Sequence, residues 1–209
     1  MSPSTAIAAA ACNRAQLGRR RRWTGYGFTL IELMVSLAVL GVLAAIAAPS
    51  FAQLMAANRL STQASELVGS MNLARSEAVR RAQPVTLRSG DDNNYSLGWT
   101  IFPDIDGNGT AASGTSETDG KTLRQTGAFK GGTTIKRVTR SAAPAPFTYT
   151  DSSDAARMYV VFTSRGTITA TAPAFFRVCD PARPAIAGRI VQVNVVGKVS
   201  IDSTSAACS

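Results

Sequence analysis

The chain has 209 residues and a formal net charge of +9, and 17% of its residues are charged. This length accommodates one modest globular domain with additional segments. There is no histidine, which excludes the commonest general base, the commonest zinc ligand and any Ser-His or Cys-His nucleophile pair. The low charged fraction and the many small and hydroxylated residues favour an exported, β-rich protein over a cytosolic helical enzyme.

The first feature along the chain is a basic cluster ahead of an apolar run. Arg14 and Arg19–Arg22 precede that run, and no acidic residue accompanies them. A basic cluster beside an apolar run is an orientation signal, and it predicts that this end of the chain stays in the cytoplasm. Because much of the positive charge is concentrated here, the net charge is weak evidence for nucleic-acid binding.

The apolar run extends from Phe28 to Ala48 and contains one carboxylate, Glu32. A run of this length can span a bilayer as a helix, although a charge inside it costs about 2.5–3.5 kcal/mol on insertion scales. A competing interpretation is a secreted hydrolase behind a cleaved signal, with a small-x-small site at Ala45–Ala47 and a mature N-terminus near Pro49. The run is longer than the roughly 7–15 apolar residues of such signals, and helical sequence continues after it.

A helical pattern continues from the apolar run to about Ala82. Apolar residues recur at helical spacing through Met71 and Ala78, Glu77 lies four residues before Arg81, and Pro84 ends the pattern. Gly41 and Pro49 are the expected bend or loosening points. The apolar stripe predicts the surface on which a sheet packs.

From Val85 onward, short β-type runs alternate with turn residues. Asp104–Gly120 is expected to be an exposed loop, and Ala142–Pro146 a linker. The expected fold class is therefore α+β, with one long N-terminal helix packed on a C-terminal antiparallel β domain. The predicted strands are Val85–Arg88, Leu97–Phe102, Thr122–Gln125, Thr133–Val138, Phe147–Thr150, Arg157–Phe162, Ala174–Cys179, Ile190–Val196 and Lys198–Ile201.

Three cysteines are distributed unevenly. Cys12 precedes the apolar run, whereas Cys179 and Cys208 lie in the segment expected to be exported. An even pair in an oxidising compartment predicts a disulfide, and the alternative is two unpaired thiols.

The residues Gly27-Phe28-Thr29-Leu30-Ile31-Glu32, behind a basic leader and ahead of an apolar helix, resemble the class III signal of type IV pilins and pseudopilins. The resemblance implies that prepilin peptidase cuts between Gly27 and Phe28 and that Phe28 becomes N-methylated. It also implies that Glu32 pairs with the N-terminal amine of a neighbouring subunit, which would give the carboxylate a cationic partner.

The same resemblance implies a chain order and a location. Residues 1–27 would be a leader that is removed, 28–48 the transmembrane and assembly helix, 49–83 the periplasmic part of the helix, and 84–209 the β domain. The protein would cross the inner membrane once, with its N-terminus cytoplasmic and its C-terminal domain periplasmic, before it enters a pilus or pseudopilus. The implied partners are other major and minor pilins or pseudopilins, prepilin peptidase and the inner membrane.

Further segments resemble the GspH/FimT pseudopilin family. They are Leu73–Arg81 with Pro84–Leu87, Leu97–Phe102, Phe176–Asp180, and Gly188-Arg189 with the late Cys208. Membership implies a non-enzymatic minor pseudopilin that assembles into or initiates a type IV pilus, closer to FimT than to GspH. The alternatives are the type II secretion pseudopilin H and a DNA-binding minor pilin for natural transformation.

DNA binding requires clustered cations, because affinity grows with the number of phosphate contacts. DNA-binding FimT-like members carry Gly-Arg-x-Arg near the C-terminus, and the matching stretch here is Gly197-Lys198-Val199-Ser200, in which lysine and serine replace the two arginines. The candidate phosphate contacts are Lys136, Arg137, Arg140, Arg183, Arg189 and Lys198.

The stretch from Asp104 to Gly109 places oxygen ligands at alternate positions, as at the start of an EF-hand loop. Asp104, Asp106 and Asn108 are thus a weak calcium candidate, because Thr115 stands where the twelfth-position glutamate belongs. An Asx/Gly turn explains the same residues. No catalytic group, metal site or cofactor is otherwise expected.

Overall fold

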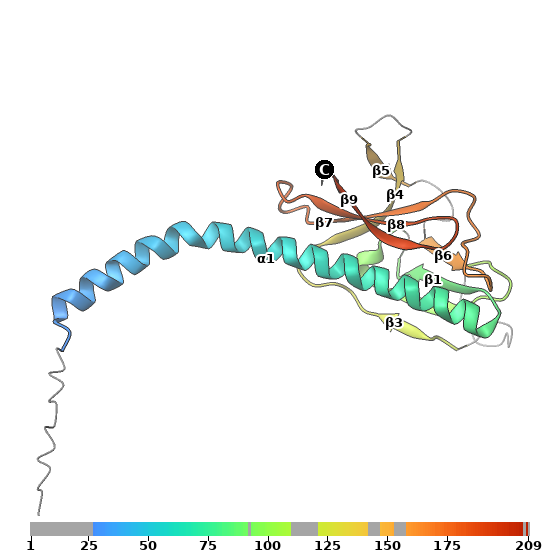
Figure 1. Cartoon of the computed structure of the whole chain (residues 1–209), viewed down its shortest axis with the longest axis horizontal. Helices are drawn as coiled ribbons and strands as arrows, with labels where there is room; N and C mark the ends of the chain where they lie inside the picture. The colour runs from blue at the N-terminus through green and yellow to red at the C-terminus, as the bar shows by residue number, and fades with distance from the viewer. Residues whose placement is uncertain are drawn as a thin grey trace, which may run out of the picture. The chain divides into compact units, whose positions relative to one another are not determined.

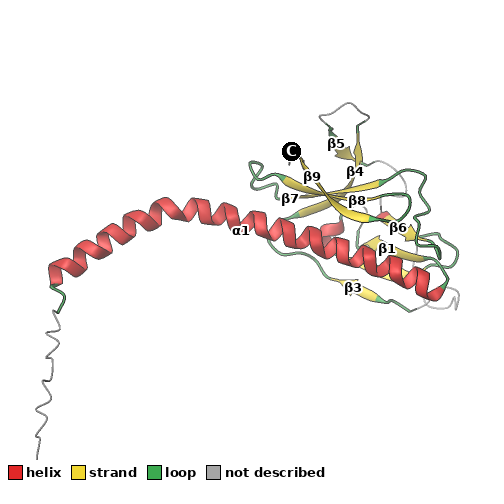
Figure 2. Ribbon diagram, viewed as in Figure 1, coloured by secondary structure: helices red, strands yellow, loops and turns green. Residues whose placement is uncertain are grey.

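The computed structural model describes residues 27–91, 93–109, 121–141, 147–152, 158–206 and 208 (Figures 1 and 2). The chain divides into two compact units, Met1–Ala45 and Ile46–Ser209. The boundary between them falls inside the first helix. The basic cluster, Cys12, most of the 104–120 loop and the 142–146 linker lie outside the described residues.

One helix, α1, covers Leu30–Arg81 without interruption, and Pro49 lies inside it. Thr29 caps the start, because its Oγ1 accepts a hydrogen bond from the backbone N–H of Glu32 at 3.2 Å. The end is closed by two backbone bonds, from Gln83 N–H to the Ala78 carbonyl and from Ala82 N–H to the Val79 carbonyl. These bonds form a Schellman motif, in which Ala82 adopts a φ of 55°.

The Ile46–Ser209 unit contains two antiparallel sheets. The four-stranded sheet has the order β3-β2-β1-β6, and the five-stranded sheet has the order β5-β4-β7-β8-β9. Strand β1 therefore pairs with β6, although more than half of the β domain's sequence separates the two strands. The strands are β1 Val85–Ser89, β2 Trp99–Pro103, β3 Arg124–Thr126, β4 Thr134–Arg140, β5 Tyr149–Asp151, β6 Tyr159–Phe162, β7 Ala174–Cys179, β8 Gly188–Val193 and β9 Val199–Ala206.

One main core joins the C-terminal part of α1 to both sheets. The helix contributes a buried stripe at helical spacing, Leu60, Ala64, Leu67, Met71, Ala74 and Ala78. The opposing side chains are alternate residues of the strands, because successive residues of a strand point to opposite faces. They include Val85, Leu87, Trp99, Ile101, Ile135, Val160, Phe162, Phe176, Val178, Val191 and Val193.

The expected α+β class and the helix-on-sheet arrangement are confirmed. The predicted strand Ala174–Cys179 has the observed bounds, and most others differ by a few residues. The strand expected from Leu97 begins only at Trp99, because Tyr95–Leu97 forms a 3₁₀ turn that ends at Gly98 with φ 101°. The expected exposure of Asp104 is wrong, because this residue is fully buried.

Candidate functional site

The N-terminal part of α1 is apolar and uncovered. Every residue from Phe28 to Ala48 is exposed, and Phe28 itself is 79% exposed. Within the described residues, α1 is the one helix long and apolar enough to cross a membrane. An apolar surface of this size signals a membrane or a partner protein.

Glu32 has a local role in the helix that was not predicted from the sequence. It occupies the third helical position after the cap Thr29 and donates its backbone N–H to the Thr29 hydroxyl. Thr-x-x-Glu is the sequence pattern of a capping box, so the motif could have been identified. A carboxylate in the first helical turn also interacts favourably with the helix dipole.

Cys179 and Cys208 form a disulfide, with their Cα atoms 5.5 Å apart. The expected pairing is confirmed. The bond joins the end of β7 to the second residue after β9, and β8 lies between these two strands. Gly188, which begins β8, lies directly against the bond, because a Cβ at this position would come 2.7 Å from Cys179 Sγ and 2.9 Å from Cys208 Sγ.

The basic residues of β4 are engaged in different ways. Lys136 Nζ pairs with Asp151 at 2.8 Å, and Arg140 lies over the ring of Phe147, 4.4 Å from its centroid. Arg137 is only 7% exposed, and its guanidinium donates to the Tyr159 carbonyl at 3.3 Å. The prediction that Arg137 contacts phosphate is therefore corrected, since its charge does not face solvent.

The C-terminal candidates lie on three other elements of the β domain. Arg183 pairs with Asp180 at 3.3 Å, in the loop after β7. Arg189 lies opposite Val178 in the β7–β8 register, whereas Lys198 lies in the exposed turn before β9. The six predicted phosphate contacts therefore come from two strands, a loop and a turn, and one of them, Arg137, is buried.

The predicted calcium loop closes on itself. Asp104 accepts hydrogen bonds from Thr86 Oγ1 at 2.5 Å and from the Gly109 N–H at 2.9 Å. The Asn108 N–H donates to both Asp104 Oδ1 and Asp106 Oδ1 at 3.1 Å. Burial raises the pKa of the Asp104 carboxyl. The described residues contain no group of three His, Cys, Asp or Glu side chains arranged to hold a metal ion, and the bonds of this loop are those of an Asx turn.

Two further arginines of α1 bind distant parts of the β domain, and the sequence predicted no role for either. Arg59 pairs with buried Asp180 at 2.6 Å. Arg75 donates from Nε to the Gly166 carbonyl at 2.9 Å and from Nη2 to the Val196 carbonyl at 3.2 Å. Both arginines thus fix α1 to loops of the domain.

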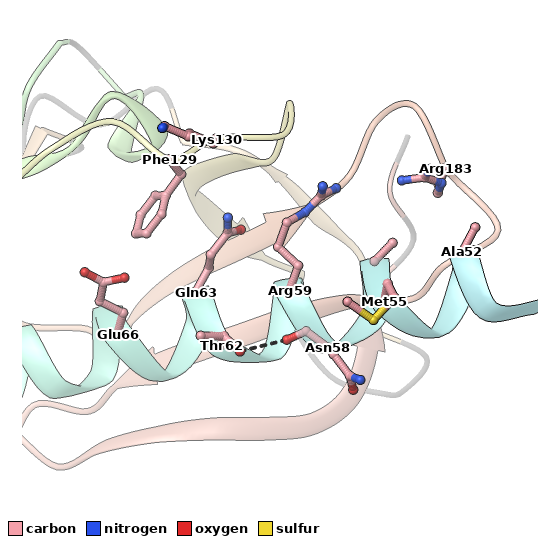
Figure 3. Close-up of a pocket in the computed structure, with 11 residues that line it drawn as sticks. Ala52, Met55, Asn58, Arg59, Thr62, Gln63, Glu66, Phe129, Lys130 and Arg183 are labelled. Atoms are coloured by element: carbon pink, nitrogen blue, oxygen red, sulfur yellow. Dashed lines mark hydrogen bonds between the residues drawn. The ribbon is translucent and has the colours of Figure 1, made fainter.

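A groove of about 800 Å³ lies beside Arg59 (Figure 3). Its lining combines apolar residues of α1 with Phe129 and with the cations Arg59, Lys130 and Arg183. Buried Gln63 also lines it, and the Gln63 Oε1 has no hydrogen-bond partner among the described residues. The groove therefore has both apolar and polar walls, and the sequence did not predict a binding site here.

Comparison with known proteins gives two family matches. Residues 63–197 match the family model described as type II transport protein GspH, and residues 26–48 match the prokaryotic N-terminal methylation motif. The second match contains Gly27, Phe28 and Glu32. The first covers the end of α1 and all strands from β1 to β8.

Individual relatives agree with these families. A fimbrial protein of Pseudomonas aeruginosa is 35% identical over 83 residues, which are 40% of this chain and 54% of the relative. The type IV major fimbrial protein FimA of Dichelobacter nodosus is 38% identical over 87 residues, which are 42% of this chain and 51% of the relative. The chain thus spans about half the length of the curated relatives it matches.

The fold is similar to that of a solved pilin. The crystal structure of the type IV minor pilin FimU of P. aeruginosa superposes with a TM-score of 0.53, at 22% identity, over 73% of this chain and 96% of FimU. At this identity the likeness concerns the fold. Taken with the uncovered apolar helix and the methylation motif, the family matches show that the chain belongs to the GspH family of pilin-like proteins, which are structural subunits.

Proposed function

We propose that this chain is a minor pilin-type subunit that assembles into, or initiates, a type IV pilus. The observation that carries the proposal is the uncovered apolar surface from Phe28 to Ala48, which coincides with the methylation-motif match. A surface of this kind is stable in a bilayer or between the apolar helices of neighbouring subunits. The chain's own described residues leave it uncovered.

Prepilin peptidase would cut between Gly27 and Phe28, and the new terminal amine of Phe28 would be methylated. The described surroundings of Gly27 are open, because a Cβ added to this residue would meet no described atom within 4 Å beyond its chain neighbours. A larger residue here would therefore act on the peptidase's recognition and not on the fold. Residues 1–27 would then be absent from the assembled subunit.

Glu32 would interact with the terminal amine of an adjacent subunit. A buried carboxylate is strongly destabilising when it has no partner, and a cation held next to it offsets much of that cost. The capping bond from the Glu32 N–H to Thr29 leaves the carboxylate itself available. The basic cluster at Arg19–Arg22 would keep the leader in the cytoplasm and place the β domain in the periplasm.

The test uses the full chain in a piliated host from which the native copy has been deleted. Glu32→Ala should leave the amount of protein in the membrane unchanged and reduce its amount in sheared filaments. Glu66→Ala is the matched control, since it removes a carboxylate of the same helix outside the apolar run. Normal filament content of Glu32→Ala would refute the pairing role.

Gly27→Ser should leave the chain at precursor length, and a mature-length band would refute the cleavage site.

A second candidate is a subunit of a type II secretion pseudopilus. The description of the family that matches residues 63–197 favours it. Both machines would use the same helix and the same processing. Deletion of the chain separates them, because loss of pili supports the first function, whereas loss of exoprotein secretion with normal pili supports the second.

A further inference from the structure

The groove in the Ile46–Ser209 unit has an apolar wall on one side. Ala52, Met55 and Ala56 contribute to it from α1. Phe129, from the loop before β4, lies over Gln63 and Glu66 at the other end of the groove (Figure 3). With a volume of about 800 Å³, the groove accommodates a small headgroup and the first part of an acyl chain. An apolar wall of this kind favours a ligand with hydrocarbon at one end.

The polar part of the groove carries an excess of positive charge. Arg59 and Arg183 both pair with the same oxygen of Asp180, so two cations share one carboxylate. Lys130 forms no ion pair with any residue that the structure describes. Glu66 also lines the groove, but it lies seven residues beyond Arg59, about 10 Å along the helix.

Two buried polar atoms in the groove have no hydrogen-bond partner among the described residues. They are the donor Nε of Arg59 and the acceptor Oε1 of Gln63, and Gln63 is only 6% exposed. Buried polar atoms are normally paired, because leaving one unpaired costs free energy. A ligand that offers both an anionic oxygen and a hydroxyl group would satisfy the two atoms together.

The groove continues an exposed apolar band within the same unit. Ile46, Phe51, Leu54 and Met55 of α1 are between 54% and 70% exposed, and Met55 belongs to both the band and the groove. Cations that follow directly after an apolar band are placed to meet anionic headgroups at the membrane surface where the band ends, which is the periplasmic surface in the proposed orientation.

We propose that this groove binds the headgroup of an anionic phospholipid. Arg183 and Arg59 Nε, which lie beside the same Asp180 carboxylate, would hold the phosphate. Gln63 would bond a hydroxyl group of the headgroup, Lys130 would add positive charge at the other end of the groove, and an acyl chain would leave beside Met55. An acidic protein segment could meet the same cations, but it would leave Phe51, Leu54 and Met55, which lie beyond the Phe28–Ala48 surface, uncovered. The proposal depends on the proposed function only in requiring that α1 be anchored in a membrane.

The test is lipid retention by the full chain, measured by native mass spectrometry after release from nanodiscs that contain phosphatidylglycerol and phosphatidylcholine in equal amounts. The wild type should retain phosphatidylglycerol in preference. Lys130→Gln combined with Arg183→Gln should reduce that preference about fivefold for each cation removed. Arg59 remains to pair with Asp180 in this variant, so the fold should persist.

Arg165→Gln combined with Lys198→Gln is the matched control, because it removes two exposed cations that are not among the residues lining the groove. The control should keep the wild-type preference. Equal retention by the groove variant and the wild type, or an equal loss in the control, would overturn the proposal. Loss of an acidic protein partner by the groove variant, with lipid preference unchanged, would also overturn it. Failure of the wild type to enter nanodiscs would instead contradict the membrane anchoring in the proposed function.

Discussion

Arg75 of α1 donates a hydrogen bond from Nε to the backbone carbonyl of Gly166, 91 residues later in the chain. Its Nη2 also reaches the Val196 carbonyl, so one guanidinium connects the turn after β6 with the turn before β9. Both turns contain a glycine with φ 75°, at Gly166 and Gly197. A Cβ at Gly197 would come 1.9 Å from the Gly166 carbonyl oxygen, so the two turns lie in direct contact beneath the arginine.

Arg75→Ala should destabilise the domain by about 2–3 kcal/mol, because two carbonyls lose a charged donor. Chemical unfolding of the full chain in detergent measures this, with the fluorescence of buried Trp99 as the signal. Arg80→Ala is the control, since its exposed pair with Glu77 should contribute less than about 1 kcal/mol. Equal stability losses in the two variants would contradict the connecting role of Arg75.

Ala82→Gly should stabilise the domain by about 1 kcal/mol. Ala82 closes the Schellman motif with a positive φ, a conformation that costs a residue with a Cβ about 1–2 kcal/mol. Glycine removes this cost and loses part of the gain through greater freedom in the unfolded chain. The same unfolding experiment measures the change, and a destabilised Ala82→Gly variant would show that Ala82 is not strained.

Removing the disulfide by changing Cys179 and Cys208 to alanine should lower the free energy of unfolding by about 3.6 kcal/mol in the chain-entropy treatment, because the sequence separation is 29.

Gly188→Ala should destabilise the oxidised protein by about 1–3 kcal/mol, since its Cβ would press on both sulfur atoms. In the double-cysteine variant the same Gly188 substitution should cost less. Additive effects would mean that Gly188 and the bond are independent.

Asp104 should give the domain a distinctive dependence on pH. Its pKa is raised above the ordinary value of 3.8, mainly by burial, so the folded chain binds this proton more tightly than the unfolded chain. The contribution of Asp104 to stability therefore rises as pH falls through the raised pKa toward 3.8 and declines as pH rises again. As the pH is lowered from about 7 to about 4, the free energy of unfolding of the wild type should increase relative to that of Asp104→Asn. Unfolding both proteins at each pH measures this difference. A difference that stays constant would contradict the raised pKa.

The sequence predicted those features that depend on local patterns. The apolar run, the helical stripe and the stop before Pro84 each follow from spacing along the chain, and α1 ends at Arg81, one residue before the expected position. The strand Ala174–Cys179 was recognisable because five of its six residues are apolar. Arg137 could also have been interpreted correctly, since it is two residues from buried Ile135 and therefore shares its face of β4.

Other features depend on contacts between distant residues. Nothing near Val85 in the sequence indicates that β1 pairs with β6, and the division into two sheets follows from such pairings. Arg59 and Asp180 are 121 residues apart, and neither stands out within its own segment. The groove results from this pair together with Lys130 and Phe129, so no single stretch of sequence could have revealed it.

The placement of α1 against the last strands also constrains the order of folding. The buried stripe of the helix includes Leu60 and Ala78, and its partners include Val191 and Val193 near the end of the chain. Contacts between residues this distant slow folding, because a long loop must close before they form. During synthesis the cover of the stripe therefore stays incomplete until β8 has emerged. This interval is when the chain is most open to proteolysis and to association with other unfinished chains.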